Sequence, residues 1–305
     1  MTVASTSDAS AKVAAASYVA GGTDVMDRYR HGLLSGPFRD VHAPSGIETG
    51  TDADGGLVVG AGTPIAALAA IGSYRGLAQA AAHLATPQIR RQGTVGGNLL
   101  QSSRCRYFRH PHLPCTHKGD PECGSREGYD DNAVLFDPGG RGCVHPHPST
   151  LAMALMAYDA EAETDGTRRP VADLYDPLDR TRTHVLGSDE RLERVHVPPA
   201  PDGERAAYLR VSARKLAEWA LVECCVRLAL DGERIARAAV AVGAVAPVPL
   251  RLPAVEAALV GERADEAAFA RAAALASEGA NPVPAARYKL RMLPAAVKQA
   301  LLDAR

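Results

Sequence analysis

A cysteine-rich segment, residues 102–148, most constrains what this chain can fold into. Four of the six cysteines lie in it, in the order Cys105, Cys115, Cys123 and Cys143, with the spacing C-x9-C-x7-C-x19-C. The segment is also rich in histidine, proline, glycine and arginine, and it shows little periodicity. An excursion of this length usually has a function or a staple that holds it in place. The four cysteines are therefore candidate metal ligands.

The cysteine spacing leaves two kinds of metal site open. No C-x-x-C pair is present, which argues against a zinc ribbon, whereas four thiolates on an irregular loop can hold an iron–sulfur cubane. Four cationic side chains and no acid lie between Arg104 and Lys118, a setting that suits the negative charge of a cluster. The alternatives are free thiols or a zinc staple that also uses histidines. The candidate histidines are His110, His112, His117, His145 and His147.

Two glycine-rich turns, "AGGTDVM" at residues 20–26 and "TVGGNLL" at residues 94–100, share one design. In each, an apolar strand is predicted to enter, two glycines make the turn and a polar residue follows. Such turns direct backbone N–H groups into one concavity that suits phosphate, and glycine lets the phosphate approach closely. Thr23 and Asn98 can add donors, whereas Asp24 would repel phosphate and is predicted to cap the next helix.

Each turn alone is also compatible with an ordinary tight connection between a strand and a helix. Neither matches G-x-G-x-x-G, so the Rossmann fingerprint is absent. The turns by themselves are therefore compatible either with a phosphate site or with ordinary connections between a strand and a helix.

The chain has 305 residues, enough for two or three domains. Its first part repeats the order strand, turn, helix, which indicates α/β or α+β architecture. We place a domain junction in a proline-bearing stretch and predict a domain at residues 1–200, which includes the cysteine segment, and another at residues 201–305. In the second domain, apolar alternation around the Asp231-Gly232 turn predicts a β-hairpin, and helices follow it.

Charge and hydropathy exclude several classes of protein. The formal net charge is -1, which does not suggest binding to nucleic acid or to an anionic membrane. No apolar run is long enough to span a bilayer and the N-terminus lacks a secretory signal, so we predict a cytoplasmic protein. The cysteines are then predicted to be thiols or metal ligands, and Cys224 and Cys225 in the hairpin to be structural.

Several motifs together resemble a known family, the FAD-binding medium subunits of molybdenum hydroxylases, which include xanthine dehydrogenase and carbon monoxide dehydrogenase. The resemblance covers residues 18–305 and rests on "YVAGGTDVM", "ATPQIRRQGTVGGNLLQ", "CVHPHPSTLAMALMAYDA", "GAVAPVPLR" and "ARYKLRML". It implies an α+β fold, with a two-part, PCMH-like FAD-binding domain followed by a C-terminal antiparallel sheet with helices. The four-cysteine loop narrows the resemblance to the β subunit of 4-hydroxybenzoyl-CoA reductase and the flavin subunit of bacterial aldehyde oxidoreductases.

The resemblance implies two cofactors, FAD and a [4Fe-4S] cluster, with the cluster held by the four cysteines of the loop. It implies that the FAD pyrophosphate is wrapped by Val19, Ala20, Gly21, Gly22, Thr23, Asp24, Val25, Met26, Thr94, Val95, Gly96, Gly97 and Asn98. Leu84, Leu192 and Arg210 match further flavin positions, and Arg210 stands where a lysine is usual. In "HPSTLA", Thr150 replaces an aspartate that contacts FAD in the family, so a charged acceptor is lost.

The implied function is electron transfer. The chain shows no catalytic triad and no paired carboxylates, which fits a subunit whose cofactors carry the chemistry. The implied partners are a molybdenum-cofactor large subunit and a [2Fe-2S] small subunit, in a heterotrimer or its dimer, with FAD serving an external acceptor or donor. The alternatives are a zinc-stapled scaffold that has lost FAD and a stand-alone flavin reductase.

Overall fold

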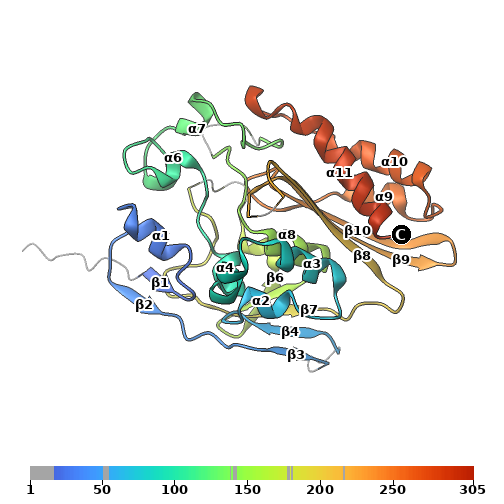
Figure 1. Cartoon of the computed structure of the whole chain (residues 1–305), viewed down its shortest axis with the longest axis horizontal. Helices are drawn as coiled ribbons and strands as arrows, with labels where there is room; N and C mark the ends of the chain where they lie inside the picture. The colour runs from blue at the N-terminus through green and yellow to red at the C-terminus, as the bar shows by residue number, and fades with distance from the viewer. Residues whose placement is uncertain are drawn as a thin grey trace, which may run out of the picture.

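The computed structural model describes residues 17–50, 55–137, 139, 143–176, 179, 181–215 and 217–305. Within these ranges the predicted α+β class is confirmed. Figure 1 shows the arrangement as layers: a five-stranded sheet, a layer of helices, a second antiparallel sheet and a final layer of helices. The cysteine-rich segment lies at one end of these layers, close to the N-terminal strands.

The N-terminal strands form a small parallel pair that carries the first glycine turn. The elements are β1 (Ser17–Val19), α1 (Val25–Arg30) and β2 (Phe38–Asp40). The strand, turn and helix predicted for this stretch are therefore confirmed.

The five-stranded sheet is antiparallel, with the order β3-β4-β7-β5-β6. Its strands are β3 (Ile47–Thr49), β4 (Leu57–Gly60), β5 (Glu161–Thr164), β6 (Thr167–Pro170) and β7 (Leu192–Val197). On its inner face Leu57 pairs with Val197 and Val59 with Val195, and all four side chains are buried. Their apolar faces pack on the helices above, as the alternation of a half-buried sheet requires.

Helices of the first domain lie between the two sheets. They are α2 (Ile65–Leu68), α3 (Arg75–His83), α4 (Pro87–Gln92), α5 (Val95–Leu99), α8 (Thr150–Ala157) and the 3-10 helix η2 (Val171–Leu174). Helix α8 is apolar on nearly all sides and is buried between the sheets, as expected for such a sequence. Ser149 caps it, accepting a hydrogen bond from the Ala152 N–H at 3.0 Å.

The second sheet is antiparallel, with the order β11-β10-β9-β8. Its elements are β8 (Arg205–Ser212), β9 (Ala220–Asp231), β10 (Arg234–Gly243) and β11 (Leu250–Arg251), followed by α9 (Pro253–Leu259), α10 (Glu266–Ala274), η3 (Leu275–Ser277), η4 (Pro284–Ala286) and α11 (Lys289–Asp303). The predicted hairpin joins β9 and β10, and Gly232 has the positive φ of 59° that this turn requires. Cys224 packs toward the outer helices and Cys225 toward the inner layer, and both are fully buried.

Three short helical turns interrupt the cysteine-rich segment: α6 (Arg106–Arg109), η1 (Thr116–Lys118) and α7 (Gly124–Glu127). A buried lysine of α11, Lys289, attaches this segment to the second domain. Its Nζ donates to the carbonyl oxygens of Asn132 at 3.1 Å and Ala244 at 2.9 Å. Burial lowers the pKa of Lys289 to about 8, against 10.5 for an exposed lysine.

Replacing Lys289 with methionine is expected to remove a pH effect on stability. Because the folded pKa lies below the unfolded one, the unfolded chain binds more protons between about pH 8 and 10.5, and stability gains roughly 3 kcal/mol across this window. Urea unfolding at several pH values should show this gain in the wild-type chain relative to Lys289→Met. A difference between the two that does not change with pH would contradict the shift.

Candidate functional site

The first glycine turn is pressed against the end of α4. Gly22 has a φ of 73°, in the region that favours glycine. A Cβ added at Gly21 would overlap the carbonyl oxygen of Gln92, whose side-chain amide donates to the Gly21 carbonyl at 3.1 Å. The backbone of the turn thus packs directly on the backbone of Gln92, with no room for a side chain between them.

The second turn differs from the prediction. The chain enters it from helix α4 rather than from a strand, because Thr86 caps a helix that begins at Pro87 and ends at Gln92. Thr94 then caps α5, accepting from the Gly97 N–H at 3.0 Å. The glycines therefore lie in the first turn of a helix. At Gly96 a Cβ would lie 2.9 Å from the Cβ of Ala61, so this helix approaches the sheet closely.

The two turns line a cavity of about 330 Å³, here called the first lobe. Its other wall is the segment at residues 184–192, in which Leu192 was the one predicted site residue. The predicted residues that line it are Ala20, Gly21, Gly22, Thr23, Asp24, Val25, Thr94, Gly96, Gly97 and Leu192. The lobe is thus built from both glycine turns, as a cradle for one ligand requires.

A neighbouring cavity of about 260 Å³, the second lobe, lies where the first domain meets the second. Apolar side chains of Ile65, Leu84 and Ile89 line it, and Arg210 and Trp219 come from the second sheet and its loop. The two lobes share the lining residues Thr23, Asp24, Thr94, Gly97 and Gln101. Together they form a two-lobed cleft of the size and composition of a small-molecule site.

Most predicted site residues meet in this cleft. Asn98 and Thr150 also line the second lobe. Three of the predicted residues lie elsewhere. Met26 is exposed, Val95 is in the core with its N–H bonded to the Thr63 carbonyl, and the Val19 carbonyl is occupied by the Val41 N–H.

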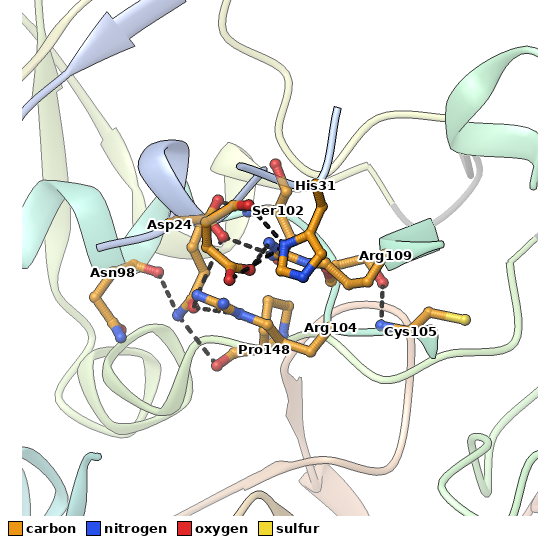
Figure 2. A network of polar contacts seen from close by, with 11 residues as sticks. Asp24, His31, Asn98, Ser102, Arg104, Cys105, Arg109 and Pro148 are labelled. Carbon is orange, nitrogen blue, oxygen red and sulfur yellow. Dashed lines mark hydrogen bonds and ion pairs between the residues drawn. The ribbon is translucent and has the colours of Figure 1, made fainter. Parts of the chain in front are cut away.

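Asp24 occupies the cap position of α1, but its side chain does not cap that helix, so this prediction is wrong. Figure 2 shows that its carboxylate lies instead among the arginines of the cysteine-rich segment. Oδ2 accepts the Ser102 N–H at 3.0 Å, and Oδ1 pairs with Arg109 at 2.6 Å and Arg104 at 3.2 Å. Burial opposes ionisation of Asp24, but the two arginines outweigh it and hold its pKa below the usual value.

Arg109 ties the first glycine turn and α1 to the cysteine-rich segment. Besides Asp24 it pairs with Asp27 at 3.0 Å and donates to the carbonyl of Ser103 at 2.8 Å. Two of the cations predicted to stabilise a cluster, Arg104 and Arg109, therefore form ion pairs with acids of the first turn and α1. Lys118 likewise donates to three carbonyl groups of its own segment.

Replacing Arg109 with methionine is expected to destabilise the chain by about 2–3 kcal/mol, because a largely buried carboxylate loses its closest partner. The matched control is Arg106→Met, which breaks an exposed pair with Asp131 and should cost below about 1 kcal/mol. Urea unfolding of both variants measures the difference. Equal losses in the two variants would show that the buried network does not hold the segment.

The four cysteines of the loop are all buried and unpaired by disulfides. Cys143 accepts a hydrogen bond from the His145 N–H at 3.4 Å, and nearby backbone N–H groups favour the thiolates of Cys105 and Cys115. The thiols also lie close enough together that ionisation of one affects ionisation of another. The thiolates of Cys105 and Cys123 disfavour that of Cys115, and all three disfavour that of Cys143. The four thiols therefore lie near one another.

Ionisation differs among these thiols. Burial raises the pKa of Cys115 to about 11 and raises that of Cys143 further. Burial also opposes ionisation of Cys105, but the hydrogen bond and charge of His145 together with nearby backbone N–H groups outweigh it and lower the pKa. His145 in turn contacts Asp130, with 3.1 Å between Nδ1 and Oδ2. A metal bound here would release the remaining protons.

Comparison with known proteins decides the family. The family described as the FAD binding domain in molybdopterin dehydrogenase matches residues 1–200, and the CO dehydrogenase flavoprotein C-terminal domain matches residues 207–304. The aldehyde oxidoreductase FAD-binding subunit PaoB of Escherichia coli K12 is 33% identical over 227 residues, covering 69% of this chain and 70% of that protein. The chain belongs to the FAD-binding subunits of the molybdenum hydroxylases. It is therefore an oxidoreductase subunit.

Solved structures related to this flavoprotein subunit share its fold. The Cu,Mo-CO dehydrogenase in its cyanide-inactivated form gives a TM-score of 0.72 at 21% identity, covering 95% of this chain and 90% of that chain. Reconstituted CO dehydrogenase from Oligotropha carboxidovorans gives 0.71 at 20%, covering 95% and 90%. Quinoline 2-oxidoreductase from Pseudomonas putida 86 gives 0.68 at 20%, covering 95% and 89%. At these identities the similarity establishes the fold of the flavoprotein subunit.

Several cleft residues of this flavoprotein subunit were missed from the sequence. They are Gln101, Arg104, Trp219 and the segment at residues 184–191. Gln101 ends the quoted "TVGGNLLQ" motif, which was a usable signal. Trp219 comes from a loop between two strands of the other domain, and no local pattern marks it. In the part of the chain that the structure describes, no helix is long and apolar enough to cross a membrane.

Proposed function

We propose that this chain is the electron-transfer subunit of a molybdenum hydroxylase-type complex and that it binds FAD in the two-lobed cleft and a [4Fe-4S] cluster in the cysteine-rich segment. The observation that carries the proposal is the Asp24–Arg109 pair, which joins the first glycine turn to the helical turn that directly follows Cys105. This pair places the flavin cleft next to the cysteine-rich segment.

The cleft suits FAD by its construction. In the first lobe a Cβ at Gly21 would overlap neighbouring backbone, and Gly22 adopts a conformation that few other residues take, so this surface presents bare backbone to a diphosphate. In the second lobe the apolar side chains would pack on a flat aromatic ring system. Arg210 would supply positive charge beside it. Bound FAD would supply two-electron chemistry, and these residues would hold its two ends.

The geometry of the cysteines favours a cluster over a single zinc ion. Four thiolates on one zinc, at about 2.3 Å from it, would hold their sulfur atoms about 3.8 Å apart. Among the described residues, the set of three ligating atoms within 4.8 Å of one another is that of Cys105, Asp130 and His145, so no three of the loop cysteines meet this spacing. A zinc ion on this mixed set is the alternative that the metal analysis below distinguishes. A cubane separates its ligand sulfurs more widely. The backbone N–H groups aimed at the thiols are also typical of iron–sulfur sites.

The FAD part of the proposal can be tested with the one tryptophan of the chain. Trp219 lines the second lobe, with its ring 5.0 Å from the Arg104 guanidinium carbon. Titration with FAD should quench its fluorescence and saturate at equimolar FAD, whereas ADP, which lacks the flavin, should leave the emission nearly unchanged. FAD binding without quenching would place the ring elsewhere.

The cluster can be tested by purifying the chain anaerobically and measuring iron, acid-labile sulfide and zinc. We expect equal amounts of iron and sulfide, with broad visible absorbance beneath the flavin bands. Zinc without iron, even after anaerobic reconstitution, would instead support the stapled scaffold.

The partners in this proposal are a molybdenum-cofactor large subunit and a [2Fe-2S] small subunit, because the described relatives belong to multi-subunit enzymes. Substrate chemistry would take place on the large subunit, and this chain would pass electrons between the iron–sulfur centres, FAD and an external acceptor or donor. Affinity purification from the native host should recover both partners. Recovery of an active flavoprotein alone would favour the stand-alone reductase.

A further inference from the structure

Behind the second lobe lies a buried carboxylate on strand β9. Glu223 is 3% exposed, and its Oε2 accepts hydrogen bonds from the Thr150 hydroxyl at 2.9 Å and the Tyr208 hydroxyl at 2.7 Å. Its cross-strand neighbour is Arg210, which also lines the second lobe. Thr150 lies between the second lobe and a smaller cavity of about 60 Å³, and it lines both; Glu223 lines the smaller cavity.

The direction of these hydrogen bonds follows from the groups involved. Burial raises the pKa of Glu223, and the Tyr208 and Thr150 hydroxyl groups and the Arg210 charge act against that rise. In its ionised form the carboxylate has no proton to donate, so both hydroxyl groups donate to it. Thr150 has a single hydroxyl hydrogen, and it donates this hydrogen in the bond to Glu223. The Thr150 oxygen then presents only lone pairs to the second lobe and can act there only as an acceptor.

We infer that Glu223 is a positioning residue for the flavin: it fixes the Thr150 hydroxyl as an acceptor for an N–H group of the bound ring. The inference rests on FAD occupying the cleft as proposed. The oxidised isoalloxazine ring carries a single N–H, flanked by carbonyl groups, so a fixed acceptor selects one orientation of it. A carboxylate placed on β9 and acting through a hydroxyl would thus replace the aspartate that the resemblance expects at position 150.

The alternative is that Glu223 serves only the packing between the domains. A structural role would make its loss reduce stability without changing how the cleft selects its ligand. The two roles differ in what a second substitution can restore, because a carboxylate moved back to position 150 can recover the ligand contact but not the original packing.

The central variant is Glu223→Gln. Its amide can donate to Thr150, which frees the hydroxyl hydrogen to point into the lobe against the ligand N–H, and FAD affinity measured by Trp219 quenching should fall about tenfold. Thr150→Val, which removes the acceptor and keeps the carboxylate, should give a similar loss. Thr150→Asp alone would place two carboxylates in contact and should weaken FAD binding, whereas the double variant Thr150→Asp/Glu223→Gln should recover most of the affinity.

Tyr208→Phe is the matched control, because it removes the other hydroxyl from Glu223 at a residue outside the cleft lining. It should keep FAD affinity within about threefold of wild type. Thermal unfolding of each apo chain monitors folding separately. Unchanged FAD affinity in Glu223→Gln and Thr150→Val, or no recovery in the double variant, would overturn the inference. A wild-type chain that binds no FAD would contradict the proposed function itself and the inference with it.

Discussion

Replacing Gly21 with alanine is expected to abolish FAD binding. The added methyl group would overlap the Gln92 carbonyl oxygen, which is backbone and cannot rotate away, so the first turn must move off the end of α4. Both glycine turns line the first lobe, and their relative position would change. We expect FAD affinity to fall at least about 100-fold and stability to fall by about 1–3 kcal/mol, the usual cost of overpacking. Flavin retained on gel filtration measures the first effect, and urea unfolding measures the second.

The matched control for this substitution is Gly72→Ala. A Cβ at Gly72 would meet no atom within 4 Å, and its backbone is not in the left-handed region. This variant should keep its flavin and its stability. Retention of FAD by Gly21→Ala would show that the packed turns are not the cofactor cradle.

Replacing Cys105 with serine is expected to remove the iron–sulfur cluster and leave FAD in place. Serine keeps the size of the side chain but is a poor ligand for iron, and loss of one of the four usual thiolates exposes an iron and makes the cluster labile. The same loss is expected at Cys115, Cys123 and Cys143. Iron content should fall to background in each variant while the flavin bands remain, and absorbance after anaerobic reconstitution measures both.

The control for the cluster ligands is Cys225→Ala. Cys225 is as buried as the ligands, but it packs in the core between the sheets. Its iron content should match that of the wild type. Loss of iron in this variant, or normal iron content in Cys105→Ser, would contradict the assignment of ligands.

The sequence carried much of the fold because local signals and burial agreed. The Asp231-Gly232 turn between alternating apolar strands can form little other than a hairpin, and Ser149 before an apolar run marks a helix start. The second glycine turn was predicted wrongly for a local reason. Thr86 before Pro87 is a helix start, and the polar stretch PQIRRQ that follows it forms α4 and not an apolar strand.

The remaining features depend on contacts between distant residues. Asp24 directly precedes a helix start. Its carboxylate does not cap that helix because it pairs with Arg104 and Arg109 of the cysteine-rich segment. Thr150 on its own indicated a lost charge. Its partner Glu223 lies 73 residues away along the chain and meets it only when the second sheet covers α8. Such pairs follow from the tertiary arrangement and leave no periodic or motif signal.

The central claim is that one chain holds a flavin and an iron–sulfur cluster in a single unit. It is tested most directly by an anaerobic reductive titration with dithionite, followed by absorbance. We expect uptake of about three electrons per chain, two by FAD and one by the cluster, with bleaching of both sets of bands. Uptake of about two electrons by a zinc-containing flavoprotein, or of none, would contradict it.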